Sequence, residues 1–228
     1  MPKSKSNKDL FEAIVAKAGL KQEVYATTLR AFNAFKDETQ LLTSDYHKKI
    51  TQSQWPIPFE YKDHGTFEFE LKFGSDILVF FMHSNVFEFS RDHEVMKSSY
   101  IKDDKKRSYC GIIHIFNFLS DSFKYNRSGD IGYLIGRIFI NRESHYFIEG
   151  KREIGLLYNN FSTSHLDIHA IKSIIESSIR YTLNFDLLTP PYDNMKEVSV
   201  MEMQATIENL SIQTGKRLGF RFQADKAE

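Results

Sequence analysis

The middle of the sequence repeats its apolar residues at every second position, and this period constrains the fold more than any other feature. Between residues 66 and 73 four apolar side chains alternate with polar or charged ones; the apolar set is Phe67, Phe69, Leu71 and Phe73. Successive side chains of a β-strand point to opposite faces of its sheet, so this segment predicts a strand with one buried and one solvated face. Residues 77–82 and 111–119 are apolar on both faces, which predicts central strands that need a cover on each side.

Other strand patterns follow with short connections. We expect strands from Phe59, at 86–89, and in a hairpin made of 132–140, a turn at 141–144, and 145–150; a strand at 154–158 would extend the series. Strands that follow strands predict an antiparallel meander, because parallel βαβ units need a helix between strands. Residues 91–107 are polar and charged and predict an excursion or a mobile loop, with Tyr100 and Ile101 as its main apolar part.

Helical periods flank this region. Leu10, Phe11, Ile14, Val15 and Ala18 predict a first helix that stops at Gly19. A second helix runs from about Lys21 and ends before Pro56. Its length predicts that it crosses the whole sheet or pairs with a second chain.

The C-terminal part predicts further helices. Ser162 to Ser164 offer N-cap residues for a helix through about Leu183, and residues 198–212 predict another helix that closes at Gly215. Residues 218–222 predict an edge strand.

These elements predict one α+β domain over residues 1–228, with an antiparallel meander of roughly five to eight strands flanked by N-terminal and C-terminal helices. Within it we expect a flexible arm at 1–8, helices at 9–55, the sheet at 57–160 and helices at 162–215.

Composition narrows the class of protein. Lys and Arg together balance Asp and Glu at 30 each, so the chain lacks the basic excess that is typical of nucleic-acid binders. The single cysteine, Cys110, forms no internal disulfide and predicts a cytoplasmic location. No apolar stretch follows the basic start, and the longest apolar run, Ile77 to Met82, is too short to span a bilayer, so we expect neither a secretion signal nor a membrane partner.

One pattern points to metal-dependent catalysis. Asp130 begins the first strand of the predicted hairpin, and Glu149-Gly150-Lys151 ends the second. This arrangement resembles the PD-(D/E)xK nuclease motif, with Gly129 in the place of its proline. The resemblance implies that Asp130 and Glu149 hold Mg or Mn, that Lys151 positions water, and that nucleic acid is the substrate.

The hairpin register bears on that resemblance. A turn flanked by Asn141 and Ser144 places Glu149 opposite Gly136, some six residues or roughly 20 Å along the strand from Asp130. Two carboxylates that share a metal ion come within about 4–5 Å of each other. Only a large bulge or a sharp bend could bring them together.

A second constellation points to a ligand pocket. His83, His114, Arg137 and Glu149 lie at the ends of, or within, strands that are otherwise apolar. A charged or polar side chain in such a strand requires a partner, because burying it alone is costly. The partner is either another residue of the chain or a bound ligand, and the sequence leaves both open.

The hypothesis that follows is a cytoplasmic binding or scaffold domain without a cofactor or evident catalysis. It would hold a protein partner, or a second copy of itself, through the sheet face or the long N-terminal helix. The alternative is the metal-dependent nuclease with Asp130, Glu149 and Lys151.

Overall fold

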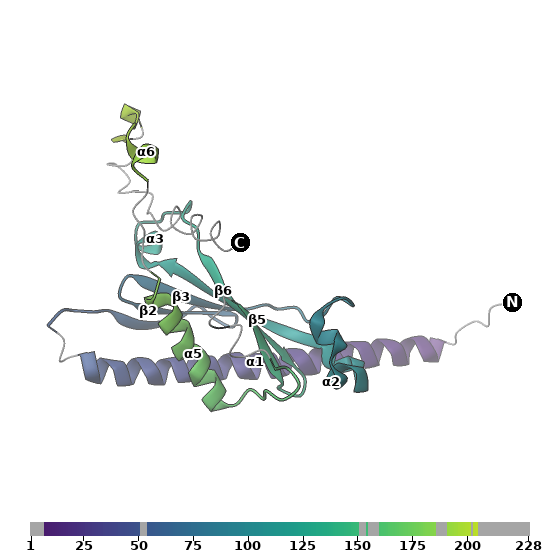
Figure 1. Cartoon of the computed structure of the whole chain (residues 1–228). Coiled ribbons are helices and arrows are strands. Elements are labelled where there is room, and N and C mark those ends of the chain that lie inside the picture. Colours follow the sequence, from purple (N-terminus) through teal and green to yellow (C-terminus); the bar gives the residue numbers. More distant parts are fainter. Residues whose placement is uncertain are drawn as a thin grey trace.

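The computed structural model describes residues 7–50, 54–150, 154, 160–185, 191–201 and 203–204. Within these residues, an antiparallel sheet of seven strands carries one long N-terminal helix and one C-terminal helix (Figure 1). The predicted α+β class with a strand meander is therefore confirmed. The prediction of a single domain remains a prediction.

The strands of the sheet are ordered β1-β2-β3-β5-β6-β7. Their bounds are β1 Phe59–Asp63, β2 Glu68–Phe73, β3 Asp76–Met82, β4 Phe87–Glu88, β5 Tyr109–Leu119, β6 Tyr133–Asn141 and β7 Tyr146–Gly150. Strand β4 pairs with the first residues of β5, beyond the end of β3, so β3 and β4 together line one side of β5. The central position predicted for the two-sided strands at 77–82 and 111–119 agrees with β3 and β5.

Helix α1, Asn7–Ile50, is one continuous helix of 44 residues. The expectation that Gly19 ends a first helix was wrong. A glycine inside a helix costs only about 1 kcal/mol relative to alanine. Leu20 and Val24, which follow it, are buried against Tyr109 of β5, and this packing holds the helix together through the glycine.

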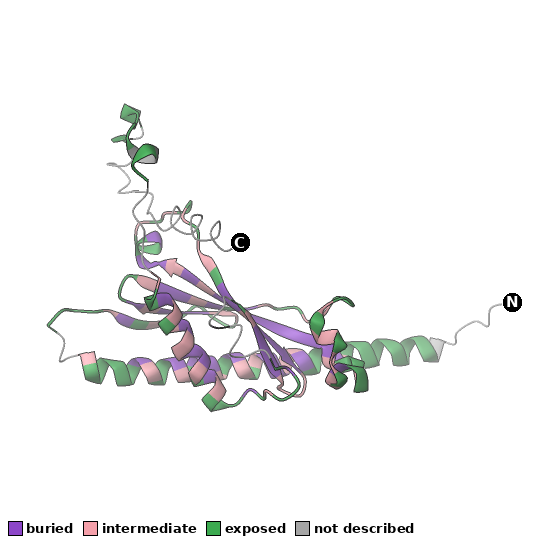
Figure 2. Cartoon of the chain, in the orientation of Figure 1, coloured by how far each residue is buried: buried purple, intermediate pink, exposed green. Residues whose placement is uncertain are grey.

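Helices α1 and α5, Ile168–Leu183, lie on the same face of the sheet. Phe32 and Phe35 of α1 and Ile174 of α5 enter one core with the inward side chains of β2, β3, β5, β6 and β7. In Figure 2 the strands above these helices are largely buried. Helix α5 starts later than the predicted caps at 162–164, because the carboxylate of Asp167 accepts the N–H of Ala170 at 2.7 Å and caps the helix there.

The described residues cover only part of the opposite face of the sheet, which is called the second face below. The cover is the 89–108 segment, which contains η1 Glu94–Lys97, α2 Ser99–Asp103 and η2 Lys105–Ser108. Ile101 of α2 is 1% exposed and packs with Cys110, Ile112 and Phe139. The predicted excursion at 91–107 lies between β4 and β5, and Tyr100 and Ile101, its predicted apolar part, pack against the sheet.

The β6–β7 hairpin differs from the prediction by one residue. Ser144 has a left-handed backbone with φ 60°, and Asn141 N–H donates to the carbonyl of His145 at 3.0 Å. The loop therefore has three residues, not two, a form in which a left-handed residue follows a type I turn. Glu149 consequently pairs with Arg137, and the predicted pairing of Glu149 with Gly136 was wrong.

Two short helices complete the described elements, α3 Ser120–Lys124 and α6 Tyr192–Met195. The strand predicted at 154–158 lies outside the described residues except for Ile154, which is buried in the main core. Most of the helix predicted at 198–212 and all of the strand predicted at 218–222 also lie outside them. No helix in the described part of the chain is long and apolar enough to cross a membrane.

Two glycines test this packing in opposite directions. A Cβ on Gly19 would meet no atom within 4 Å, whereas a Cβ on Gly111 would lie 2.1 Å from Oγ1 of the buried Thr28. We expect Gly19→Ala to raise the free energy of unfolding by about 0.5–1 kcal/mol through helix propensity. We expect Gly111→Ala to lower it by about 1–3 kcal/mol through overpacking. Urea unfolding followed by circular dichroism measures both, and equal effects would contradict the packing of α1 on β5.

Candidate functional site

The uncovered part of the second face is lined with aromatic rings. We call this surface the aromatic face; it consists of Phe81, His83, Phe87, His114, Phe116, Phe118 and Phe123. Each ring lies next to another member, with centroid separations from 4.8 Å between His83 and Phe87 to 6.4 Å between Phe116 and Phe118. Such distances are those of favourable aromatic pairs.

The aromatic face arises from the same alternation that builds the core. In β3 and β5 one set of side chains packs under α1, and the other set points to the second face. The 89–108 segment reaches only the part of that face around Ile112 and Phe139. Phe81 is therefore 36% exposed, Phe87 38% and Phe123 48%.

Strand register brings three of the four predicted pocket residues into one row. His114 pairs with Arg137, and Arg137 pairs with Glu149, on neighbouring strands. Phe81 pairs with His114 on the other side. His83 joins the row through the ring of Phe81, at a centroid distance of 6.4 Å.

A cavity of about 210 Å³ lies beside this row. Its apolar walls include Cys110, Ile112 and Phe139, and burial raises the pKa of the Cys110 thiol well above its ordinary value. Arg137 and Glu149, also among its lining residues, form an ion pair. The cavity can therefore hold an apolar group next to the Arg137–Glu149 ion pair.

His93 extends this charged group from the 89–108 segment. Its Nε2 lies 3.5 Å from Oε1 of Glu149, and its ring packs against Phe89 with centroids 4.8 Å apart. Sequence reasoning missed His93 because it lies in a segment that was expected to leave the sheet as an excursion or a mobile loop. It also missed the aromatic face, because both faces of the two-sided strands were expected to be covered by helices.

His114 is the polar centre of the aromatic face. Burial lowers the pKa of its imidazole, and the nearby positive charge of Arg137 and His83 lowers it further. Its Nδ1 atom is buried and has no hydrogen-bond partner among the described residues. A buried acceptor or donor without a partner is costly, so this nitrogen adds a polar cost to an otherwise apolar surface.

The residues of the predicted nuclease motif are engaged separately. Asp130 accepts a hydrogen bond from the hydroxyl of Ser122 at 2.7 Å and lies 4.0 Å from Arg127, whereas Glu149 pairs with Arg137. Lys151 lies outside the described residues. Within the described residues, no group of three or more His, Cys, Asp or Glu side chains could hold a metal ion. The nuclease hypothesis stays a prediction that no observed geometry supports.

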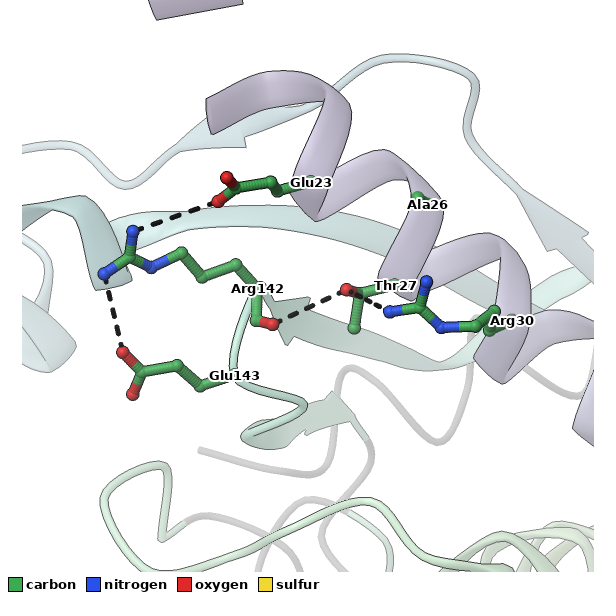
Figure 3. A pocket seen from close by; sticks show the side chains of 6 residues that line it. All are labelled: Glu23, Ala26, Thr27, Arg30, Arg142 and Glu143. Atoms are coloured by element: carbon green, nitrogen blue, oxygen red, sulfur yellow. Dashed lines mark hydrogen bonds and ion pairs between the residues drawn. The ribbon is translucent and has the colours of Figure 1, made fainter. Parts of the chain in front are cut away.

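A larger cavity of about 430 Å³ lies between α1 and the β6–β7 turn (Figure 3). Arg142 points into it and lies 3.9 Å from Glu23 and 3.7 Å from Glu143, while a further bond of 2.7 Å reaches Asp104. These ion pairs join α1, the hairpin turn and the 89–108 segment. Their charges already have partners within the fold, so the cavity is a weaker candidate for ligand binding.

Glu143 shows how firmly this junction is built. Burial raises the pKa of its carboxyl, but hydrogen bonds from Tyr100 and Arg107 outweigh burial and leave the pKa below its ordinary value. The Arg107 Nε lies 3.0 Å from Oε2 of Glu143, and the Tyr100 hydroxyl donates to the same oxygen at 2.9 Å. The junction fixes the edge of the 89–108 cover and thereby the border of the aromatic face.

The first turns of α1 expose a second apolar surface. Leu10 is 61% exposed, Phe11 68%, Ile14 55% and Val15 54%, and the helix passes beyond the sheet there (Figure 2). The spacing predicted that these residues share one side of a helix, and they do. No described residue covers them as a core would.

Comparisons of the chain with known proteins found no relative. No protein-family model matches the chain, and no curated protein and no solved structure matches it.

The lowered pKa of His114 predicts a pH effect on stability. The unfolded chain titrates near the ordinary pKa of 6.5 and binds the proton more readily than the folded protein. Stability from neutral His114 is therefore complete above pH 6.5 and is lost as the pH falls through 6.5 towards the folded pKa. We expect His114→Phe to unfold with a smaller pH dependence than the unchanged protein.

Urea unfolding between about pH 7.5 and pH 5 measures this effect around the histidine pKa. His169→Phe, at an exposed position of α5, is the matched control and should keep the original pH dependence. An equal pH dependence in the His114 variant and the unchanged protein would contradict the burial of a neutral imidazole.

Proposed function

We propose that this chain is a binding domain that docks a protein partner on its aromatic face. The observation that carries the proposal is the continuous set of half-exposed rings on one part of a sheet face whose other part is covered. Contiguous apolar patches on a protein surface mark interaction sites, whereas single exposed apolar residues need no explanation.

The residue types favour a protein as the partner. Aromatic side chains and arginine are enriched at the centres of protein interfaces, where a few of them supply most of the binding energy. Phe81, Phe87 and Arg137 supply both types here. The exposed rings are fixed by contacts with one another, so little side-chain entropy is lost when a partner covers them.

The size of the cavity beside Arg137 supports the same proposal. Its volume of about 210 Å³ is below the range of about 300–1,000 Å³ that holds small-molecule ligands. A space of this size suits one apolar side chain of a partner. His93 and the Arg137–Glu149 pair would then border the anchor residue and exclude water from it.

The charges around the rings argue against nucleic acid on this surface. Lys72 and Arg137 are bases on this face, while Glu68, Glu70 and Glu149 are acids. The nucleobases of single-stranded DNA or RNA could stack on the rings, but the phosphates would need an excess of positive charge on the protein. The proposed partner is therefore an apolar protein segment, and the lone buried cysteine favours a cytoplasmic place of action.

A random-peptide display library tests this function with the whole chain as the target. We expect enriched peptides to carry an aromatic or aliphatic anchor residue, and we expect Phe81→Gln to weaken their binding about tenfold or more because a central ring is lost. Fluorescence polarisation with the selected peptides measures the affinity.

Leu41→Gln is the matched control, because Leu41 is 59% exposed on α1 and remote from the aromatic face. It should leave the affinity unchanged. Failure to enrich any peptide, or peptides that bind the Phe81 variant as well as the unchanged protein, would contradict the proposal. Circular dichroism of both variants separates loss of binding from loss of fold.

A further inference from the structure

Strand β1 forms an open edge of the sheet. Within the described residues, the strand order ends at β1, whose one ladder is with β2. Helix α1 packs under the face of β1, and Lys36 of the helix also donates to the carbonyl of Gly65, just beyond the strand, at 2.6 Å. Lys36 pairs with Asp63 at 2.7 Å, and Tyr46 stacks on Phe59 with centroids 4.2 Å apart.

The hydrogen bonds at the two ends of the β1–β2 ladder fix which backbone groups face outwards. Gly74 N–H donates to the carbonyl of Pro58 at 2.9 Å, and His64 N–H donates to the carbonyl of Glu68 at 3.1 Å. Even-numbered residues of β1 therefore bond to β2, since bonded residues alternate in an antiparallel ladder. The N–H and C=O groups of Phe59, Tyr61 and Asp63 point away from the sheet.

The sequence of this edge is complementary to itself. We propose that β1 pairs antiparallel with β1 of a second copy of the chain, about a two-fold axis at Tyr61. Phe59 then lies opposite Asp63 of the other copy, and Tyr61 lies opposite Tyr61. All outward backbone groups of these three residues acquire partners, and the sheet continues from one copy into the next.

Charge selects this register over its neighbours. Glu60 and Lys62 are exposed on the other side of β1, and the two-fold places Glu60 opposite Lys62 of the second copy, twice. Glu60 has no ion pair within the described residues, while Lys62 lies 3.2 Å from Glu70 of its own chain. Charged residues on an edge strand normally prevent pairing, but here their signs and spacing match across the axis.

Exposed apolar residues beside the edge favour the same contact. Trp55 is 70% exposed and Ile57 45% exposed, and both precede β1. In the proposed register Ile57 comes beside Gly65 of the second copy. A symmetric pair needs such a patch on each copy, because a two-fold interface uses the same surface twice.

Sedimentation equilibrium of the full chain over a range of concentrations tests the pairing. We expect the unchanged protein to reach the mass of two chains, and we expect Glu60→Lys to weaken the dimer about tenfold or more, because it sets lysine opposite lysine at both symmetric positions. Glu60 is exposed and makes no ion pair in the described residues, but the change also sets lysine opposite Lys72 of the same chain, so circular dichroism must show that the variant keeps its fold. Glu12→Lys on α1 makes the same charge change away from β1 and should leave the dimer intact.

A mixing experiment makes the test specific to the register. Lys62→Glu alone should also dimerise more weakly, and circular dichroism must show that it keeps its fold, because the change removes a partner of the buried Glu70. An equimolar mixture with Glu60→Lys should form a heterodimer, because every facing pair is again of opposite sign. A protein that stays a single chain at all concentrations would overturn the pairing. A dimer that Glu60→Lys leaves intact, or variants that do not combine when mixed, would overturn it as well. These outcomes do not depend on peptide binding by the aromatic face.

Discussion

The hydrogen bonding of β5 on both of its sides is the constraint on which the rest of the structure depends. This strand of 11 residues bonds to β3 and β4 on one side and to β6 on the other. Because it is apolar on both faces, each face needs a cover. One face receives α1 so closely that Gly111 is required where Thr28 of the helix packs on the strand. On the other face the 89–108 segment covers one part, and the aromatic rings of the other part stay exposed.

The division of the second face decides where aromatic rings stay exposed. The 89–108 segment is held by Ile101, which packs on the sheet, and by the junction of Tyr100, Arg107 and Glu143. Its border leaves His114 half-buried, with a lowered pKa, between covered and open regions. The proposed binding function rests on this border, because the described residues cover one part of an apolar surface and leave the other part exposed.

Much of this structure could be predicted from the sequence. The alternation of apolar residues in β2 and the apolar runs of β3 and β5 predicted the strands, since that period is a direct consequence of strand geometry. The proximity of His114, Arg137 and Glu149 also followed from the search for partners of polar residues in apolar strands. The left-handed backbone of Ser144, which shifts the hairpin register by one residue, could not be predicted from the sequence.

Other features depend on tertiary contacts that no local pattern reports. Gly19 would end an isolated helix, but burial of Leu20 and Val24 against Tyr109 overrides its propensity. The 89–108 segment is polar at most positions, but its apolar residues pack against the sheet; they are Phe89, Val95, Met96, Tyr100 and Ile101. This packing also brings His93 next to Glu149.

The edge of β1 and the aromatic face are geometrically compatible. An antiparallel two-fold at Tyr61 that continues the sheet has its axis perpendicular to the sheet, so the same face of each copy points the same way. Both copies of α1 then lie on one side, and both aromatic faces lie on the other. Two weak sites on one rigid surface bind a partner with two matching segments more tightly than either site alone, because the second contact is intramolecular. Pairing through the edge would thus strengthen binding on the face without burying any of its rings.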